Sequence, residues 1–344
     1  MKTPRINSLQ TLRLFASLGV VQYHLWENYF DVAIGHPGTD IFLVLVGVVT
    51  AYTQAKRIPA GNWWGYIKSR YRRLYVTYIP LFFIALIFKW SEADLGWAVR
   101  SFFFIPMDRA PVIGPTWMLS MFMLFYFVFS VCFLVKSEKV LWLLFSAWAI
   151  LIAMYNLTNW QPQFPDYWNN LLFAERNLDF ILGYGVGVIL RNGWLRTAQA
   201  RTLMWAGFFG IVVGTVLLNL GYDAEGRAFI VGVPIAVFIL GVSSLELKDA
   251  KSGMVRFLTT PWLVWLGASS YVLYLSHTMF FQAWSQVLPV APIWALPMTV
   301  GAVTVGALGY VFWERPVLAY LTSRRIKVPG FSVADIRLKS KNEG

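Results

Sequence analysis

Long apolar runs recur from one end of the chain to the other, and short polar connections separate them. A hydrocarbon core about 30 Å thick is crossed by a helix of about 20 mainly apolar residues, so each run is long enough to span a bilayer. Averaging hydropathy over about 19 residues predicts about ten such helices. They lie near residues 11–29, 39–55, 74–90, 114–135, 139–155, 172–190, 203–220, 226–245, 262–284 and 293–313. The pattern therefore predicts an all-α integral membrane protein of about ten transmembrane helices.

The composition favours one membrane domain. Hydrophobic residues make up 58% of the 344-residue chain and charged residues only 13%, which leaves too little polar surface to cover a water-soluble globule. We expect a polytopic membrane domain over residues 1–322 and a short basic cytoplasmic tail over residues 323–344. No small-residue cleavage site follows the first apolar run, so we expect that run to be a retained span.

Lys and Arg are concentrated in alternate connections between the predicted spans. The second connection is rich in Lys and Arg and has no acid, whereas the first contains Asp31 and neither Lys nor Arg. Because short loops that carry Lys and Arg remain in the cytoplasm, both termini are expected to be cytoplasmic. The residues that set this pattern are Lys56, Arg57, Lys68, Arg70, Arg72, Arg73, Arg191, Arg196 and Arg201 inside, and Asp31, Asp166, Asp223 and Glu225 outside. The net charge of +12 then faces anionic lipid, and we expect no nucleic-acid partner.

The first span carries polar side chains that a bilayer should exclude unless they are paired or hydrated. Arg13 and His24 are eleven positions apart, which on a helix means about 16 Å along the axis and about 20° in direction. Glu27 follows His24 after about one turn and could fix the tautomer of its imidazole. Arg13 could instead snorkel at the end of the span, and His24 could simply be bonded to a neighbouring helix. We interpret the two residues as one functional face.

The other histidines differ in their expected surroundings. His277 is expected at a depth similar to that of His24, because the ninth span runs outward like the first. These two histidines could face one cavity. His36 lies in the first connection beside Pro37 and is expected to be a solvated loop residue. Three scattered histidines without helical His and Glu spacing give no metal signal.

Three acids and an arginine occupy the outer ends of predicted spans. Asp40 opens the second span, where it could cap the helix or line a cavity. Glu175, Arg176 and Asp179 occupy consecutive turns of the sixth span, where they could neutralise one another or line the same cavity.

Together these residues resemble the motifs of the membrane-bound acyltransferases of family 3, which O-acylate cell-surface carbohydrates in bacteria. Arg13 and His24, with ten residues between them, are similar to the signature of that family's first helix. Phe122 departs from the fourth-helix pattern, because many members have Glu at that position. The other similar segments, in the family's order, are Gly38 to Gly47, Arg70 to Arg73, Pro115 to Tyr126, Arg176 to Gly183, Ser270 to His277 and Glu314 to Pro316. The resemblance extends over nearly the whole chain.

The resemblance implies an O-acyltransferase of the bacterial inner membrane. Such an enzyme would move an acyl group, commonly acetyl, from cytoplasmic acyl-CoA to a hydroxyl of an extracytoplasmic or lipid-linked saccharide. Acyl-CoA would be a co-substrate, and no bound cofactor is implied. Arginine forks suit phosphate groups, so Arg13, Arg70 and Arg73 are expected to bind the donor. Membrane lipid and the saccharide or glycolipid acceptor are the other expected partners.

His24 is the expected catalytic residue, with Glu27 beside it. It could act as general base on the acceptor hydroxyl or as a transient acyl carrier, and the sequence leaves both open. The side chains expected to form the acceptor cavity are Asp40, Trp117, Tyr126, Arg176, Asp179 and His277. A transporter or flippase for a lipid-linked sugar is the rival hypothesis, because polar residues within spans also line transport pathways.

Overall fold

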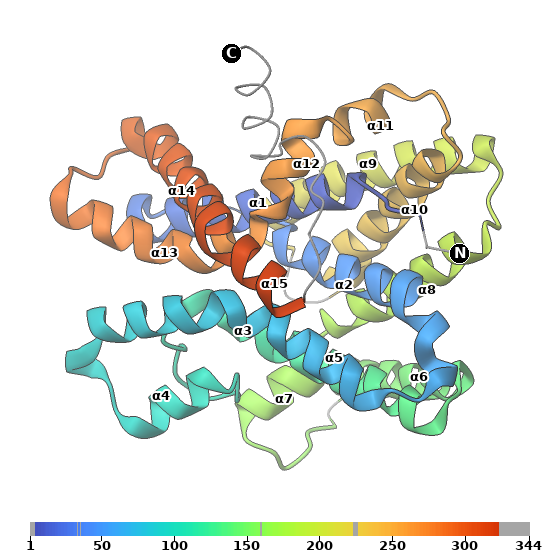
Figure 1. The fold of residues 1–344 in the computed structure, drawn as a ribbon, viewed down its shortest axis with the longest axis horizontal. Helices are drawn as coiled ribbons and strands as arrows, with labels where there is room; N and C mark the ends of the chain where they lie inside the picture. The colour runs from blue at the N-terminus through green and yellow to red at the C-terminus, as the bar shows by residue number, and fades with distance from the viewer. Residues whose placement is uncertain (1–3, 33, 35, 159, 223–225, 323–344) are drawn as a thin grey trace, which may run out of the picture.

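The computed structural model describes residues 4–32, 34, 36–158, 160–222 and 226–322. Within these residues the chain forms helices joined by short loops, and it forms no strand. The α-helices are α1 (Ser8–Phe30), α2 (Gly38–Gln54), α3 (Trp63–Phe88), α4 (Leu95–Phe102), α5 (Trp117–Val135), α6 (Glu138–Leu157), α7 (Asp166–Leu172), α8 (Asn177–Asn192), α9 (Thr197–Asn219), α10 (Val233–Leu247), α11 (Gly253–Leu258), α12 (Pro261–Ala268), α13 (Ser270–Val287), α14 (Ala295–Gly309) and α15 (Arg315–Thr322). The long helices run across the view in Figure 1, with α1 and α2 near the middle. The prediction of an all-α chain is confirmed for the described residues.

Seven helical segments of the described residues are long and apolar enough to cross a membrane. They are Gly38–Ala60, Trp63–Phe88, Gly114–Val135, Glu138–Leu157, Thr197–Asn219, Ala228–Leu247 and Pro292–Thr322. The chain is therefore a multi-pass membrane protein. The other predicted spans form α1, which carries polar residues, the 16-residue α8, and the pair α12 and α13. The total of about ten spans and the cytoplasmic placement of both termini stay predictions.

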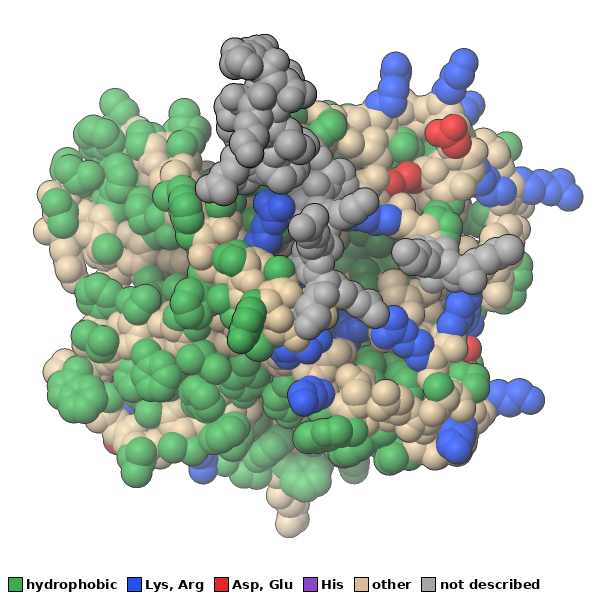
Figure 2. Space-filling view, in the orientation of Figure 1, with side chains coloured by type: hydrophobic (Ala, Val, Ile, Leu, Met, Phe, Trp, Pro, Cys, Tyr) green, Lys and Arg blue, Asp and Glu red, His purple; other side chains and the backbone are tan. Residues whose placement is uncertain are grey.

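Some sequence predictions fall on residues that the structure does not describe. The basic tail over residues 323–344 lies outside the described residues, as do Asp223 and Glu225. On the face that Figure 2 shows, Lys and Arg side chains lie in the centre and at the right, whereas the left is mainly hydrophobic.

Two predicted element boundaries are wrong. The span predicted near residues 74–90 begins at Trp63, so Arg70, Arg72 and Arg73 lie inside α3 instead of in a connection. This helix starts early because the Asn62 side chain caps it, accepting the backbone N–H of Gly65 at 2.9 Å. The span predicted near residues 262–284 is divided at residue 269 into α12 and α13.

Small residues let α2 and α8 approach closely. A Cβ atom at Gly183 would lie 2.1 Å from the carbonyl oxygen of Val44, and one at Gly187 would lie 2.6 Å from that of Val48. Only glycine leaves room for such backbone contact. Close packing of α2 and α8 therefore accounts for these two glycines. Gly185 points elsewhere, because a Cβ there would have no neighbour closer than 4.0 Å.

Candidate active site

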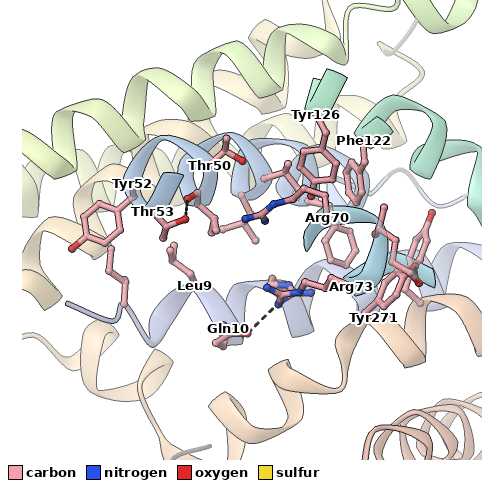
Figure 3. A pocket seen from close by; sticks show the side chains of 18 of the residues that line it. Leu9, Gln10, Thr50, Tyr52, Thr53, Arg70, Arg73, Phe122, Tyr126 and Tyr271 are labelled. Atoms are coloured by element: carbon pink, nitrogen blue, oxygen red, sulfur yellow. Dashed lines mark hydrogen bonds between the residues drawn. The ribbon is translucent and has the colours of Figure 1, made fainter. Parts of the chain in front are cut away.

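A cavity of about 340 Å³, here called the basic cavity, lies between α1, α2, α3, α5 and α13 (Figure 3). Arg5, Arg13, Arg70 and Arg73 are its cationic lining residues, and Tyr126 lines it as well. In Figure 3, Arg70 and Arg73 reach from α3 into the space beside α1 and α2. The fold thus brings together all three arginines that were predicted to bind the donor.

Arg70 is held between two aromatic rings. Its guanidinium carbon lies 5.3 Å from the ring centroid of Tyr66 and 5.7 Å from that of Tyr126. Such cation–π contacts contribute about 0.5–2 kcal/mol, with the larger values in desolvated sites. The Nε atom of Arg70 is buried and has no hydrogen-bond partner among the described residues. The side chain therefore keeps a donor that an anion in the cavity could use.

The remaining charges of the basic cavity are unbalanced. Arg13 and Arg73 lie close enough to repel each other, and the hydrogen bond of Arg13 from Nη1 to Oε1 of Gln10 is long, at 3.4 Å. The buried Glu314 attracts both arginines. In the part of the chain that the structure describes, no salt bridge joins either arginine to an acid. The excess of positive charge suits a ligand with several phosphate groups.

Glu314 is a site residue that reasoning from the sequence did not single out. It ends the π-helical turn Tyr310–Glu314, and its Oε2 atom is buried without a hydrogen-bond partner among the described residues. Such wide turns occur frequently at functional sites. The only signal in the sequence is the segment Glu314 to Pro316, which gives no indication that Glu314 faces Arg13 and Arg73.

Arg72 lies on the same helix as Arg70 but makes a different contact. Its Nη1 atom donates to the carbonyl oxygen of Leu321 on α15 at 3.2 Å, and it does not line the basic cavity. Residues two positions apart on a helix differ by about 200° in direction, which explains the separation. Arg72 therefore serves as a matched control for Arg70.

His24 and His277 form a pair, as the estimate of their depth predicted. Their ring centroids lie 5.3 Å apart. His277 is fully buried, and its Nδ1 atom lies 3.2 Å from the carbonyl oxygen of Leu273. If Nδ1 carries the proton, it donates to this carbonyl, and Nε2 is left with a free lone pair. That Nε2 atom has no hydrogen-bond partner among the described residues, so it is available to a substrate or to His24.

His24 is half-buried and less firmly fixed than His277. Its Nδ1 atom lies 3.5 Å from the side-chain amide of Asn28, which is long for a hydrogen bond. Glu27 is exposed, and its charge reaches the imidazole, but no hydrogen bond joins these two described side chains. The Glu27 carboxylate therefore influences the His24 imidazole by its electrostatic field and not by a hydrogen bond. Neither histidine lines the basic cavity.

Asp40 takes part in a buried ion pair with Arg227. Its two oxygens accept hydrogen bonds from Nε and Nη2 of Arg227 at 2.9 and 2.8 Å, and Asp40 is fully buried. The helix cap considered for Asp40 is wrong, because Pro37 occupies the N-cap position. Arg227 was missed by sequence reasoning. Its signal is an arginine at the end of an apolar segment that is predicted to lie outside, where the distribution of basic residues disfavours one.

His36 is not the solvated loop residue that the sequence suggested. Its ring centroid lies 4.7 Å from that of Tyr23, and its Nδ1 atom accepts the backbone N–H of Gly38 at 3.1 Å. Its carbonyl oxygen accepts a hydrogen bond from Nη2 of Arg227 at 2.8 Å. Burial lowers the pKa of the His36 imidazole to about 4, so this ring is neutral at physiological pH. The loop folds back onto α1 because Gly19 and Gly38 allow close approach.

A second cavity of about 830 Å³, here called the Trp117 cavity, lies between the loop before α5 and α7. Trp117 and Arg176 line it, and the Arg176 guanidinium carbon lies 5.7 Å from the ring centroid of Trp117. Its other polar lining residues are Asp108, Arg109, Ser120, Asp166, Tyr167 and Asn170. An aromatic ring beside charged and amide groups suits a polar ligand with apolar faces.

The structure divides the residues predicted for the acceptor cavity. Trp117 and Arg176 line the Trp117 cavity, whereas Tyr126 lines the basic cavity. Asp179 is fully buried beside Asp40, and its two oxygens have no hydrogen-bond donor among the described residues. The Oε1 atom of Glu175 accepts the backbone N–H of Gly226 at 3.0 Å. Asp40, Asp179 and His277 line neither of these two cavities.

The fold and the site define a class of protein: a multi-pass membrane protein with a cationic cavity and an adjacent histidine pair. A family model described as an acyltransferase domain, that of the acyltransferase 3 family, matches residues 6–313. Because this match covers most of the chain, the protein belongs to the acyltransferase 3 family and is a membrane acyltransferase that transfers groups other than aminoacyl groups. No curated protein and no solved structure matches the chain. No group of three described His, Cys, Asp or Glu side chains could hold a metal ion.

Proposed function

We propose that this acyltransferase moves an acetyl group from cytoplasmic acetyl-CoA to a hydroxyl of an extracytoplasmic or lipid-linked saccharide in a bacterial inner membrane. The observation that carries the proposal is the basic cavity. It joins Arg13, Arg70 and Arg73, which come from two helices, around a space in which positive charge exceeds negative charge. Guanidinium groups bind phosphate through paired, charge-assisted hydrogen bonds, and CoA is a polyphosphate ligand.

The lining of the basic cavity also supports one orientation of the bound acetyl-CoA. Its lining on α2 extends from Thr53 to Phe42, eleven positions or about 16 Å along the helix at 1.5 Å per residue. The basic residues Arg5 and Arg13 lie on α1 or just before it, and the lining at Phe42 and Tyr274 is aromatic. Phosphates held at the basic part would send an extended thioester arm toward the aromatic end. His277 follows Tyr274 by three positions on α13.

The histidine pair supplies the proton chemistry of the proposal. An imidazole nitrogen of His24 accepts the proton of the acceptor hydroxyl, and the oxygen then attacks the thioester carbonyl carbon. The carbon–sulfur bond breaks, and the imidazolium returns its proton to the CoA thiolate. In the alternative route His24 itself takes the acyl group and passes it to the hydroxyl. When Nδ1 of His277 carries the proton, the lone pair on its Nε2 can accept an N–H of His24, whose ring lies 5.3 Å away, and this would orient the His24 ring.

The Trp117 cavity is the proposed entry for the saccharide. Trp117 offers an aromatic face, and Arg176 beside it offers hydrogen-bond donors. Both belong to the residues expected to bind the acceptor. Arg176 also acts electrostatically on His36, which packs on Tyr23 next to His24, so this cavity lies near the histidine pair.

The test is transfer by the purified protein in lipid vesicles supplied with labelled acetyl-CoA and a polysaccharide extract of the source membrane. The proposal expects labelled carbohydrate and free CoA. His24→Gln, which keeps an amide but has no titrating nitrogen, should lower kcat by about 10² to 10⁴. Near-normal transfer by this variant would reduce His24 to a hydrogen-bonding role and move the catalytic assignment to His277.

The donor site is tested with matched arginine variants. Arg70→Ala and Arg73→Ala should each raise the KM for acetyl-CoA, because each removes charge-assisted hydrogen bonds worth about 1.5 to 3 kcal/mol, or about 10- to 150-fold. Arg72→Ala is the control, because Arg72 contacts Leu321 and not the cavity. Equal effects of all three variants would show that these arginines act on folding or on lipid, and would place the donor elsewhere.

A further inference from the structure

The end of the basic cavity next to His277 is lined by buried apolar side chains. Phe42, Met118, Leu119 and Tyr274 line this end, and each is less than a tenth exposed. The rings of Phe42 and Tyr274 meet edge to face with centroids 5.5 Å apart. We call these two rings the aromatic wall. Packing of this density leaves little space that a ligand could enter without moving a side chain.

The aromatic wall stands between the basic cavity and the histidine pair. The Tyr274 ring faces the cavity, yet its centroid is only 6.2 Å from that of His277, whose ring in turn lies 5.3 Å from that of His24. The Tyr274 hydroxyl donates to the carbonyl oxygen of Pro115, which fixes the ring at the start of α5. A thioester that comes from the cavity must therefore meet the histidines at this wall.

We propose that the aromatic wall of Phe42 and Tyr274 limits the transferred acyl group to a very short chain. The proposal rests on the proposed function. With the CoA phosphates at the arginines, the acyl chain is the leading end of the extended thioester arm, so it has to fit at the wall before the carbonyl carbon can reach the histidines. An acetyl group has two carbons and needs only a small displacement of the Phe42 and Tyr274 rings. Each further methylene has to displace a ring that is held by packing on one side and by a hydrogen bond on the other.

The test compares acetyl-, butyryl- and octanoyl-CoA as donors for the wild-type protein and for Phe42→Leu, with CoA release and labelled product as readouts. The wild type is expected to prefer acetyl-CoA. In Phe42→Leu the ratio of kcat/KM for butyryl-CoA to that for acetyl-CoA should rise about 10-fold or more, because hydrophobic pockets discriminate by about 10- to 200-fold per methylene. Tyr274→Phe keeps the ring but removes its hydrogen bond to Pro115, and it should shift the ratio in the same direction.

Phe145→Leu is the matched control, because Phe145 is equally buried on α6 but packs on Phe125 and Tyr184 away from the cavity. It should leave the ratio unchanged. Equal use of acetyl- and octanoyl-CoA by the wild type, or an unchanged ratio in both wall variants, would overturn the acyl-length proposal and leave the proposed function intact. Release of CoA from none of the donors would instead overturn the proposed function, and the proposal with it.

Discussion

The ion pair between Asp40 and Arg227 is the feature whose removal has the clearest predicted cost. Asp40 has no exposed surface, Arg227 is 8% exposed, and two hydrogen bonds of 2.8 and 2.9 Å join them. Breaking a buried ion pair by removal of one partner typically costs about 3–5 kcal/mol, because the other charge is left without compensation. Arg227→Met should therefore destabilise the protein by about 3–5 kcal/mol.

Two local features place this cost at the upper end of that range. Arg227 also donates to the carbonyl oxygen of His36, so the variant loses a further hydrogen bond. Asp179, fully buried, lies beside Asp40, so the removed cation leaves two adjacent carboxyl groups in one apolar site. By contrast, replacement of both partners with apolar residues of similar volume is often close to neutral. The double variant Asp40→Leu, Arg227→Met should recover most of the lost stability.

The measurement is unfolding in mixed micelles of a mild detergent and SDS, analysed as a double-mutant cycle. Arg109→Met is the control, because Arg109 pairs with Asp94 at 3.5 Å while 43% of its side chain is exposed. Exposed pairs contribute about 0–1 kcal/mol. A cost for Arg227→Met no larger than that for Arg109→Met, or a double variant less stable than Arg227→Met alone, would refute the reasoning.

Three further predictions follow from the arrangement of charge and packing. Reporter fusions after Lys56 should report the cytoplasm and those after Asp166 the outside, and the opposite pattern would reverse the proposed donor and acceptor sides. Raising the ionic strength from about 0.05 to 0.5 M should raise the KM for acetyl-CoA, since screening weakens phosphate binding, while a constant KM would argue against an electrostatic donor site. Gly183→Ala should cost about 1–3 kcal/mol of stability in unfolding measurements, because its Cβ would meet the Val44 carbonyl, whereas Gly185→Ala should be neutral or slightly stabilising.

The spans could be predicted because a bilayer requires an apolar run of sufficient length from each spanning segment separately. A run of apolar residues is enough to identify α5 or α10, whatever those helices pack against. The start of α3 could not be found in this way. Hydropathy averaging ends a span where arginines begin, but a helix needs only an unbroken backbone and a cap, and Asn62 supplies the cap eight positions before Arg70.

The same distinction applies to the candidate site, where relations within one helix could be predicted and contacts between distant elements could not. Arg13 and His24 lie on one helix, so the spacing alone indicates that they share a face, and the depth of His277 follows from the order of the spans. The pairing of Asp40 with Arg227 depends on how α2 and the turn before α10 pack together, and no periodicity within either segment contains that information. Interactions between elements that are far apart in the sequence are therefore the part that sequence reasoning misses here.

Trp117 and Tyr126, which were predicted to line one cavity, line two different cavities in the structure, and helix geometry explains why. The two residues are nine positions apart on α5, and nine steps of about 100° turn the direction by about 180°. They point to opposite faces, so Tyr126 lines the basic cavity together with Met118 and Trp117 lines the other cavity together with Ser120. One helix thus separates the two cavities. In the proposed reaction, donor and acceptor approach α5 from different sides and meet beside its N-terminal end, where the carbonyl of Pro115, just before the helix, accepts the hydrogen bond of Tyr274.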